Sequence, residues 1–146
     1  EAKDMIDRYF EAYPGVRAYL DATVEQARER GYAETMFGRK RHIPELHAGN
    51  ANLRGFGERT AMNHPMQGSA ADIIKLAMIE VSRMLREEGF AAKLLIQVHD
   101  ELDFSVPRSE VEALSAMVRE VMEGVVELKV PLIADVSSAP TWAEAH

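Results

Sequence analysis

The chain has 146 residues, of which 47% are hydrophobic and 28% charged, a balance typical of a globular domain with a real core rather than of a disordered chain. It contains no cysteine, no apolar run of membrane-spanning length and no signal peptide pattern. We therefore expect no disulfide, no thiolate metal site, no membrane partner and a cytoplasmic setting. The formal net charge of −7 argues against nucleic-acid binding by the chain as a whole.

The charge is unevenly distributed along the chain. Residues 1–99 hold 14 basic and 14 acidic side chains, so the whole negative excess lies in residues 100–146, which hold 3 basic and 10 acidic ones. The neutral part contains Arg39, Lys40 and Arg41 in a row. It can therefore offer a contact surface to DNA that the total charge conceals.

The first half of the chain is predicted to consist of helices and one hairpin. Its opening residues, EAKDMIDRYF, already have helical character, so we expect the chain to start inside a longer protein. A helix over residues 3–12 precedes a second one, which begins at Pro14 and reaches about residue 30, where Gly31 ends it. Two short β-like runs then flank Gly38, which predicts a hairpin. After a loop, a further helix is expected from about residue 52 to residue 63, because Pro65 must kink or end it.

A long helix over residues 69–88 is the clearest element of the second half. Ser69 and Asp72 resemble a capping box at its start, and Gly89 is suited to end it. Its apolar residues keep helical spacing. They are Ile73, Ile74, Ala77, Met78, Val81 and Leu85.

Two strands and another helix follow. Residues 93–98, KLLIQV, form an apolar run typical of a buried strand, and residues 102–106 alternate in polarity. Three polar residues separate the two runs, which predicts an antiparallel hairpin with a polar tip. Ser109 and Glu112 resemble a capping box that opens the next helix, and residues 131–136, PLIADV, are predicted to form a last strand. The fold class that this order predicts is α+β, with helices and a small antiparallel sheet.

The tip of the hairpin, His99, Asp100 and Glu101, is the feature that indicates chemistry. Two adjacent carboxylates at the end of an apolar strand repel each other and lose hydration, and a divalent cation offsets that cost. Oxygen ligands favour Mg²⁺, and in two-metal phosphoryl transfer such ligands hold the ions that activate the attacking hydroxyl and stabilise the leaving oxygen. From these residues alone a solvated turn stays open as well, because Asp favours turns.

Several segments resemble family A DNA polymerases, in one order and over essentially the whole chain. QVHDEL, flanked by apolar runs, resembles the active-site hairpin of that family, and ERTAMNHPMQGSAADIIKLAM resembles its preceding helical segment. RYFEAYPGVRAYL and GYAETMFGRKRHIP resemble helices and a hairpin of the fingers, and the ending with VPLIADV and Trp142 resembles the C-terminus of the family. The resemblance implies that residues 1–57 are the distal part of the fingers and residues 58–146 the C-terminal part of the palm.

The resemblance implies roles for the hairpin tip. Asp100 matches the metal-binding aspartate of the family, Glu101 the neighbouring carboxylate that assists at the metal, and His99 the histidine that contacts the primer end. The activity implied is template-directed nucleotidyl transfer in DNA replication and repair. The implied partners are primer–template DNA and dNTP, with Mg²⁺ in a two-metal site. Without the family, His99 reads equally well as a hydrogen-bonded turn residue.

Three polar residues of the preceding segment match family residues that contact the primer–template near the insertion site. Arg59, Asn63 and Gln67 have i, i+4, i+8 spacing, so they share one helical face if Pro65 kinks the helix without ending it. Their guanidinium and amide groups can donate hydrogen bonds to minor-groove acceptors. Without the family, the same spacing reads as a solvated stripe.

The family's second metal-binding aspartate and its triphosphate-gripping finger helix have no match in this sequence, so we expect them in the remainder of the same polypeptide, before residue 1. The chain alone is therefore expected to be inactive. Two other classes stay open: a stand-alone Mg²⁺-dependent nuclease or phosphatase using Asp100 and Glu101, and a non-catalytic helical interaction domain whose acidic last third binds a basic partner. Three residues depart from the family pattern: Ser137 and Ala139 replace the usual glycines, and Asp103 replaces an apolar strand residue.

Overall fold

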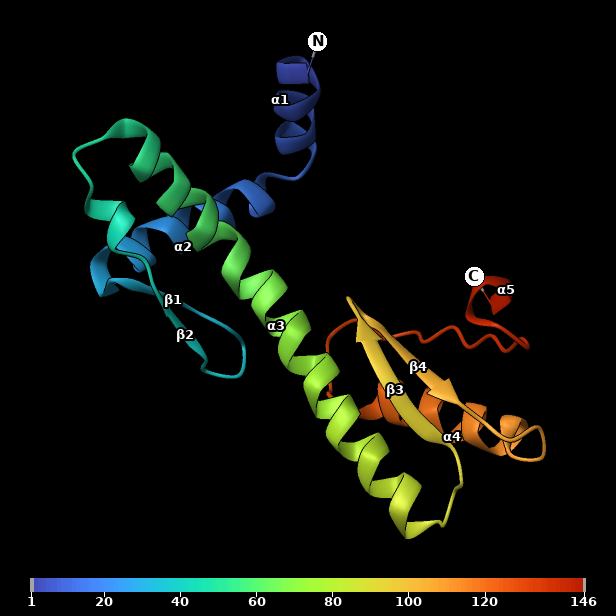
Figure 1. Cartoon of the computed structure of the whole chain (residues 1–146). Coiled ribbons are helices and arrows are strands. Elements are labelled where there is room, and N and C mark those ends of the chain that lie inside the picture. Colours follow the sequence, from blue (N-terminus) through green and yellow to red (C-terminus); the bar gives the residue numbers. More distant parts are fainter. Residues whose placement is uncertain (1, 146) are drawn as a thin grey trace. The chain divides into compact units, whose positions relative to one another are not determined.

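The computed structural model describes residues 2–145, and these divide between Ser69 and Ala70 into two compact units (Figure 1). Helices dominate, and the two sheets are antiparallel pairs of strands, β1 with β2 and β3 with β4. The predicted α+β class is confirmed. Among the described residues no helix is both long and apolar enough to cross a membrane. We call the two parts unit 1, Glu1–Ser69, and unit 2, Ala70–His146.

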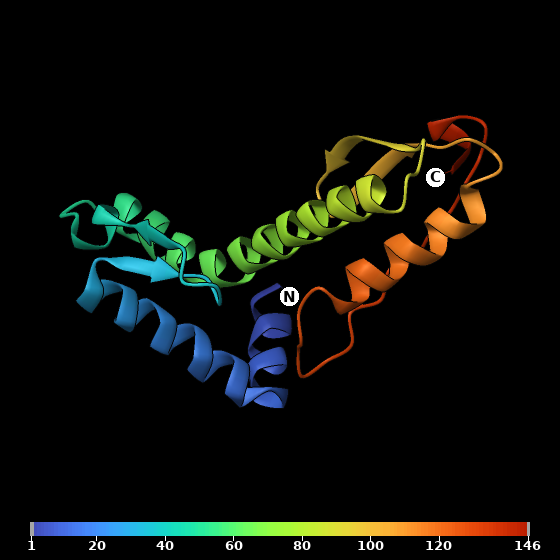
Figure 2. The ribbon, with the colours of Figure 1, turned by 90° about the horizontal axis from the view of Figure 1, so that it is seen from below.

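Unit 1 holds two helices, a hairpin and the first half of a long helix. The predicted helices and the Gly38 hairpin are confirmed, and Gly31 ends the second helix with a φ of 78° while its N–H donates to the Ala27 carbonyl. The hairpin lies between α2 and the first half of α3 (Figure 2). The elements are α1 (Ala2–Ala12), α2 (Pro14–Arg30), β1 (Tyr32–Glu34), β2 (Lys40–His42), the 3-10 helix η1 (Pro44–His47) and the start of α3 (Ala51–Glu87).

Small side chains allow these elements to approach closely. The buried core of unit 1 contains three alanines beside two larger residues. Gly57 of α3 lies against η1, where an added Cβ would stand 2.8 Å from the Leu46 amide nitrogen. No side chain fits at that distance, so glycine is required at position 57. The core residues are Ala27, Ala33, Ile43, Leu46 and Ala61.

Helix α3 corrects two predictions at once. It runs without a break from Ala51 to Glu87 with Pro65 inside it, so the helix expected to stop near residue 63 continues, and Ser69 does not begin a new one. Ser69 lies in mid-helix, where its hydroxyl donates to the Pro65 carbonyl and accepts a hydrogen bond from the Met36 amide. The capping box predicted at Ser69 and Asp72 is therefore wrong. The sequence alone does not distinguish a serine that caps a helix from a mid-helix serine whose hydroxyl bonds back to the carbonyl of residue i−4.

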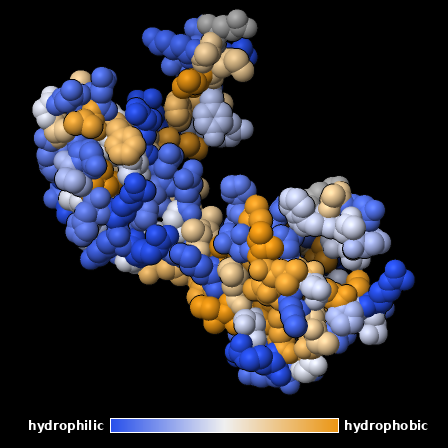
Figure 3. Space-filling view, in the orientation of Figure 1, coloured by the Kyte–Doolittle hydropathy of each residue, from blue (hydrophilic) through white to orange (hydrophobic). Residues whose placement is uncertain are grey.

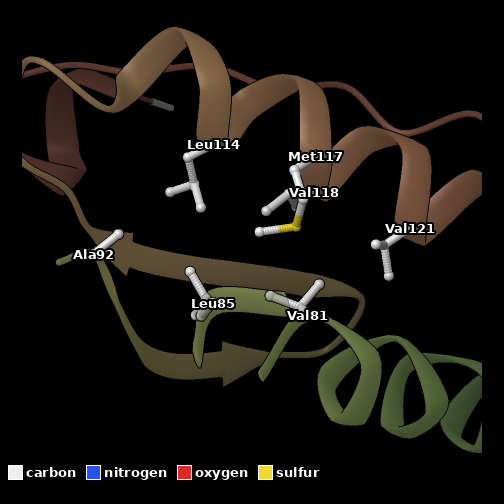
Figure 4. Packing of buried hydrophobic residues seen from close by; sticks show 7 residues of the cluster. All are labelled: Val81, Leu85, Ala92, Leu114, Met117, Val118 and Val121. Atoms are coloured by element: carbon white, nitrogen blue, oxygen red, sulfur yellow. The ribbon is translucent and has the colours of Figure 1, made fainter. Parts of the chain in front are cut away.

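Unit 2 packs α4 across α3 and one side of a hairpin. Its elements are the rest of α3, β3 (Lys93–Val98), β4 (Glu101–Ser105), α4 (Val111–Gly124) and α5 (Trp142–Ala145). Gly89, at a φ of 74°, ends α3 as predicted. Side chains of α4 point toward α3 and the strands (Figure 4). The buried cluster is Val81, Leu85, Ala92, Leu114, Met117, Val118 and Val121.

The β3–β4 hairpin is confirmed, but its burial differs from the prediction. Leu94 and Phe104 pack against the core, whereas most of β3 is exposed within the described residues, including Leu95 and Ile96. The ladder is irregular between Leu94 and Ile96, which shifts the register there. An apolar run does not distinguish a strand covered on both faces from one covered on a single face.

Two predictions for the last third are wrong. Helix α4 has no side-chain cap, and instead of Ser109 and Glu112 forming a capping box, the Glu110 carboxylate accepts from the Ala91 and Ala92 amides at 3.0 Å each. Residues 131–136 form no strand. Their backbone bonds to α4 side chains instead: the Ala134 amide donates to Glu123 at 3.0 Å, and Arg119 donates to the Ala134 carbonyl at 3.3 Å.

Candidate metal and nucleic-acid site

The β3–β4 hairpin reverses in two residues. Val98 pairs with Glu101, so His99 and Asp100 form the turn. His99 has a φ of 54°, the only positive φ of a non-glycine residue among those described. A type I′ turn needs positive φ at both positions, so this turn is a different one. Backbone in this region costs a bulky residue on the order of 1 kcal/mol, and such strain gathers at functional sites.

The predicted tip residues lie together and face solvent. His99, Asp100 and Glu101 are all exposed, and the Gln97 side-chain amide donates to the His99 carbonyl. The base of the hairpin is held by the packing of Leu94 and Phe104 on the core. A packed base with a polar tip therefore presents the two adjacent carboxylates at one end of the hairpin in unit 2.

The tip fits part of a metal site. Carboxylate oxygens are the ligands that Mg²⁺ accepts, and Mg²⁺ commonly uses one or two of them beside water and substrate phosphates. Over residues 2–145, no group of three or more His, Asp or Glu side chains is placed to hold a metal ion. Two carboxylates alone could therefore fill only part of the ligand shell of such an ion.

A second group of predicted site residues lies in unit 1. Arg59, Asn63 and Gln67 are exposed on α3, and because the helix continues through Pro65 their spacing places them on one face. The sequence predicted a shared face on the condition that the helix does not end at Pro65, and this condition is met. The face carries one guanidinium and two amides, all hydrogen-bond donors.

The basic cluster of the β1–β2 hairpin is partly engaged inside unit 1. Arg39 donates to the Gly68 carbonyl at 2.9 Å, and the Lys40 ammonium lies 4.6 Å from the centre of the Tyr32 ring. Arg41 is exposed. The first two side chains therefore have structural contacts beside any role toward phosphate.

The three departures from the family pattern have different surroundings. Asp103 is half-buried in β4, and its Oδ2 atom is enclosed without a hydrogen-bond partner. Ser137 and Ala139 are exposed in the extended tail, where the Ser137 hydroxyl donates to the Ala145 carbonyl at 2.7 Å. A glycine at position 137 has no hydroxyl and could not make this contact.

The profile of DNA polymerase family A matches residues 1–144. The chain belongs to DNA polymerase family A. It is 50% identical over 145 residues to DNA polymerase I of Streptococcus pneumoniae and 52% identical to that of Geobacillus stearothermophilus, in each case over 99% of this chain. A solved structure of the POL domain of Pol1 from M. smegmatis, in complex with DNA primer-template and dNTP, superposes with a TM-score of 0.95 at 46% identity.

The chain spans only part of these family A relatives. It covers 16% of the S. pneumoniae protein, 17% of the G. stearothermophilus protein and 26% of the M. smegmatis chain, although 99% of its own length is matched in each. The 146 residues thus correspond to about a sixth of each of the two bacterial polymerases.

One feature near the α3 face was not predicted. The loop 35–39 is fastened to the turn of α3 that carries Gln67, through contacts of Met36 and Arg39 with Ser69 and Gly68. In the sequence, the residue that could have indicated this contact is Gly68, which follows Gln67. An added Cβ on Gly68 would stand 2.6 Å from the Thr35 Cγ2 atom, so this glycine marks a close approach.

Proposed function

We propose that this chain is the C-terminal portion of a DNA-directed DNA polymerase that performs template-directed nucleotidyl transfer. The observation that carries the proposal is the hairpin tip of this family A chain, where a strained two-residue turn presents Asp100 and Glu101 to solvent. Family membership favours this activity over a stand-alone nuclease or an interaction domain. A cytoplasmic setting is part of the proposal, because the chain has no cysteine and its substrate is DNA.

Mg²⁺ is the proposed cofactor, with Asp100 as its main ligand in this chain and Glu101 as an assisting carboxylate. These residues would help to hold two ions, whose chemistry would be activation of the primer hydroxyl and stabilisation of charge on the leaving oxygen. Asp100 would hold its charge at the tip of a hairpin whose base packs on the core through Leu94 and Phe104. The second aspartate of the site belongs to the remainder of the same polypeptide.

The proposed DNA contacts are His99 at the primer end and Arg59, Asn63 and Gln67 along the primer–template. A polymerase must accept every correct pair, so a readout of base identity in the major groove would be unsuitable. In the minor groove, purine N3 and pyrimidine O2 are acceptors at similar places in all correct pairs. Donors on the exposed face of α3 can therefore test the shape of a pair without reading its identity.

The chain is proposed to combine the distal part of the fingers, residues 1–57, with the C-terminal part of the palm, residues 58–146. The compact units divide later, between Ser69 and Ala70, because α3 continues from one unit into the next. The incoming dNTP is a partner of the complete protein, since the finger helix that grips the triphosphate lies outside this chain.

The proposal is tested by comparing the isolated chain with the complete protein in a primer-extension assay with Mg²⁺. We expect extension by the complete protein and none by the purified chain, because loss of one metal clamp and of substrate positioning removes most of the catalysis. Template-directed incorporation by the chain alone, with contaminating polymerase excluded, would contradict the proposal. So would a complete protein that neither binds nor extends primer–template DNA.

A further inference from the structure

The loop 35–39 of the β1–β2 hairpin has a fixed internal shape. The Thr35 amide donates to the Arg39 carbonyl and the Gly38 amide to the Thr35 carbonyl, both at 3.0 Å. The Thr35 hydroxyl accepts from the Phe37 amide at 3.3 Å and from the Arg39 amide at 3.2 Å. Thr35 is only 5% exposed, and Gly38 has a φ of 82°. The loop is thus preorganised by its own hydrogen bonds.

This loop is bonded to one short stretch of α3, residues 64–69, from 25 to 33 positions away in sequence. The Met36 amide donates to the Ser69 hydroxyl at 2.9 Å, and the Arg39 guanidinium donates to the Gly68 carbonyl at 2.9 Å. The His64 Nε2 atom lies 3.3 Å from the Arg39 carbonyl, which accepts. Ser69 and His64 are each 8% exposed, so two of the three contacts involve nearly buried side chains.

The turn that receives these bonds is intrinsically weak. Pro65 has no N–H, so the helical bond to the Ala61 carbonyl cannot form, and its ring crowds that carbonyl. The Ser69 hydroxyl donates to the Pro65 carbonyl while it accepts from Met36. One hydroxyl therefore links the proline turn to the loop. Close contact at Gly68, where a Cβ would meet Thr35 at 2.6 Å, allows the loop to lie directly on the helix.

Gln67 projects from this same turn and is exposed, whereas its neighbours Gly68 and Ser69 are buried against the loop. We propose that the loop 35–39 is a clamp that orients Gln67 for its contact with the minor groove, with Ser69 as the positioning residue that joins loop and helix. The inference rests on the DNA-contact role proposed above for Gln67. It assigns to the hairpin a function in the accuracy of extension that is separate from any phosphate contact by its basic residues.

The test uses the complete protein and a primer that ends in a purine whose N3 atom is replaced by carbon. The quantity measured is the ratio of the extension rates from the natural and the modified primer end. This ratio compares two substrates on one enzyme preparation, so an unfolded fraction cancels and a purely structural role of Ser69 leaves the ratio unchanged. Gln67→Ala reports the contact itself, and Ser82→Ala is the matched control, a serine of α3 whose hydroxyl accepts from Arg86 at 3.0 Å.

We expect the unmodified enzyme to extend the natural end about five to ten times faster, the value of one neutral hydrogen bond. Gln67→Ala should bring the ratio close to one. Ser69→Ala should reduce the logarithm of the ratio to half its value in the unmodified enzyme or less. Ser69→Thr keeps the hydroxyl and should retain most of the ratio, and Ser82→Ala should retain all of it. Arg39→Gln, which removes the bond to Gly68 without touching Ser69, should also lower the ratio.

Two different failures are distinguishable. An unchanged ratio in Ser69→Ala and Arg39→Gln, with the ratio lost in Gln67→Ala, overturns the clamp and leaves the DNA contact of Gln67 in place. An unchanged ratio in Gln67→Ala overturns the contact, and the clamp with it. If Ser69→Ala yields no folded enzyme, the ratio in Arg39→Gln decides between clamp and passive packing on the same criteria.

Discussion

Asp103 is the residue whose chemistry fits its surroundings least. It lies in β4 opposite Ile96, half-buried, and its Oδ2 atom has no hydrogen-bond partner among the described residues. An enclosed polar atom without a partner loses its hydration and gains nothing in return. The sequence identified this position as a departure from the family pattern, but only the packing of the hairpin reveals that one carboxylate oxygen is enclosed.

Replacing Asp103 by valine should therefore stabilise the protein. We expect Asp103→Val to raise the midpoint of thermal unfolding of the complete protein, by an amount that corresponds to about 1 kcal/mol. Asp103→Asn is the control, because it keeps the shape and a polar atom in the same place and should give a much smaller gain. A lower unfolding midpoint in Asp103→Val would show that the carboxylate has a partner in the complete protein.

At the scale of elements, the sequence predicts well those features that depend on local chemistry. Pro14, Gly31, Gly38 and Gly89 lie where predicted, because the fixed φ of proline and the positive φ open to glycine act within a few residues. The hairpin tip with Asp100 was also predictable from local sequence, because polar residues between two apolar runs indicate a turn.

Features that depend on a distant contact were not predictable. The sequence does not reveal that the Ser69 hydroxyl accepts a hydrogen bond from the distant Met36 amide, so Ser69 resembled a helix cap. Nor does it reveal that α3 continues through Pro65. Residues 131–136 have a strand-like composition but bond to α4 instead of to a strand. The sequence shows the i, i+4, i+8 spacing of Arg59, Asn63 and Gln67. Whether they share one helical face depended on whether the helix continues through Pro65.

The contact between α3 and η1 gives a prediction for two glycines of the same helix. Gly57→Ala places a Cβ 2.8 Å from a backbone nitrogen of η1, which must shift, so we expect a loss of about 1–3 kcal/mol. Gly55→Ala meets only the end of the Arg59 side chain, at 3.5 Å, and should stabilise the helix by up to about 1 kcal/mol. Hydrogen exchange of the α3 amides in the complete protein measures both changes; equal effects of the two substitutions would contradict the close approach.

At the scale of the whole molecule, unit 2 exposes several large apolar side chains. Apolar side chains gather over the β3–β4 hairpin and the adjacent part of α3 on one face (Figure 3). Leu95 is 62% exposed, Ile79 67% and Ile133 78%. Large exposed apolar patches mark surfaces that are covered in the working protein. The relatives are about six times as long as this chain, and we expect other parts of the same polypeptide to cover this surface.

The isolated 146-residue chain should accordingly bind a hydrophobic dye and self-associate, whereas the complete protein should not. Replacing Leu95 and Ile96 together by glutamine should lower dye binding by the isolated chain, and Gln97→Asn, on the same strand, should leave it unchanged. Dye fluorescence and light scattering measure the two effects. If the isolated chain is monomeric and binds no dye, the expectation that other parts of the polypeptide cover this surface is wrong.

The most direct measurement of the central claim is single-turnover incorporation by the complete protein with Asp100→Asn. The substitution keeps the shape of the side chain and removes the charge that holds the ions, so we expect the rate to fall about a thousandfold while primer–template affinity is largely kept. Glu101→Gln should cost less, and Asp135→Asn, an exposed aspartate of the tail, should cost nothing. A rate for Asp100→Asn within about twofold of that of the unmodified protein would contradict a catalytic role for the hairpin tip and reduce it to a turn.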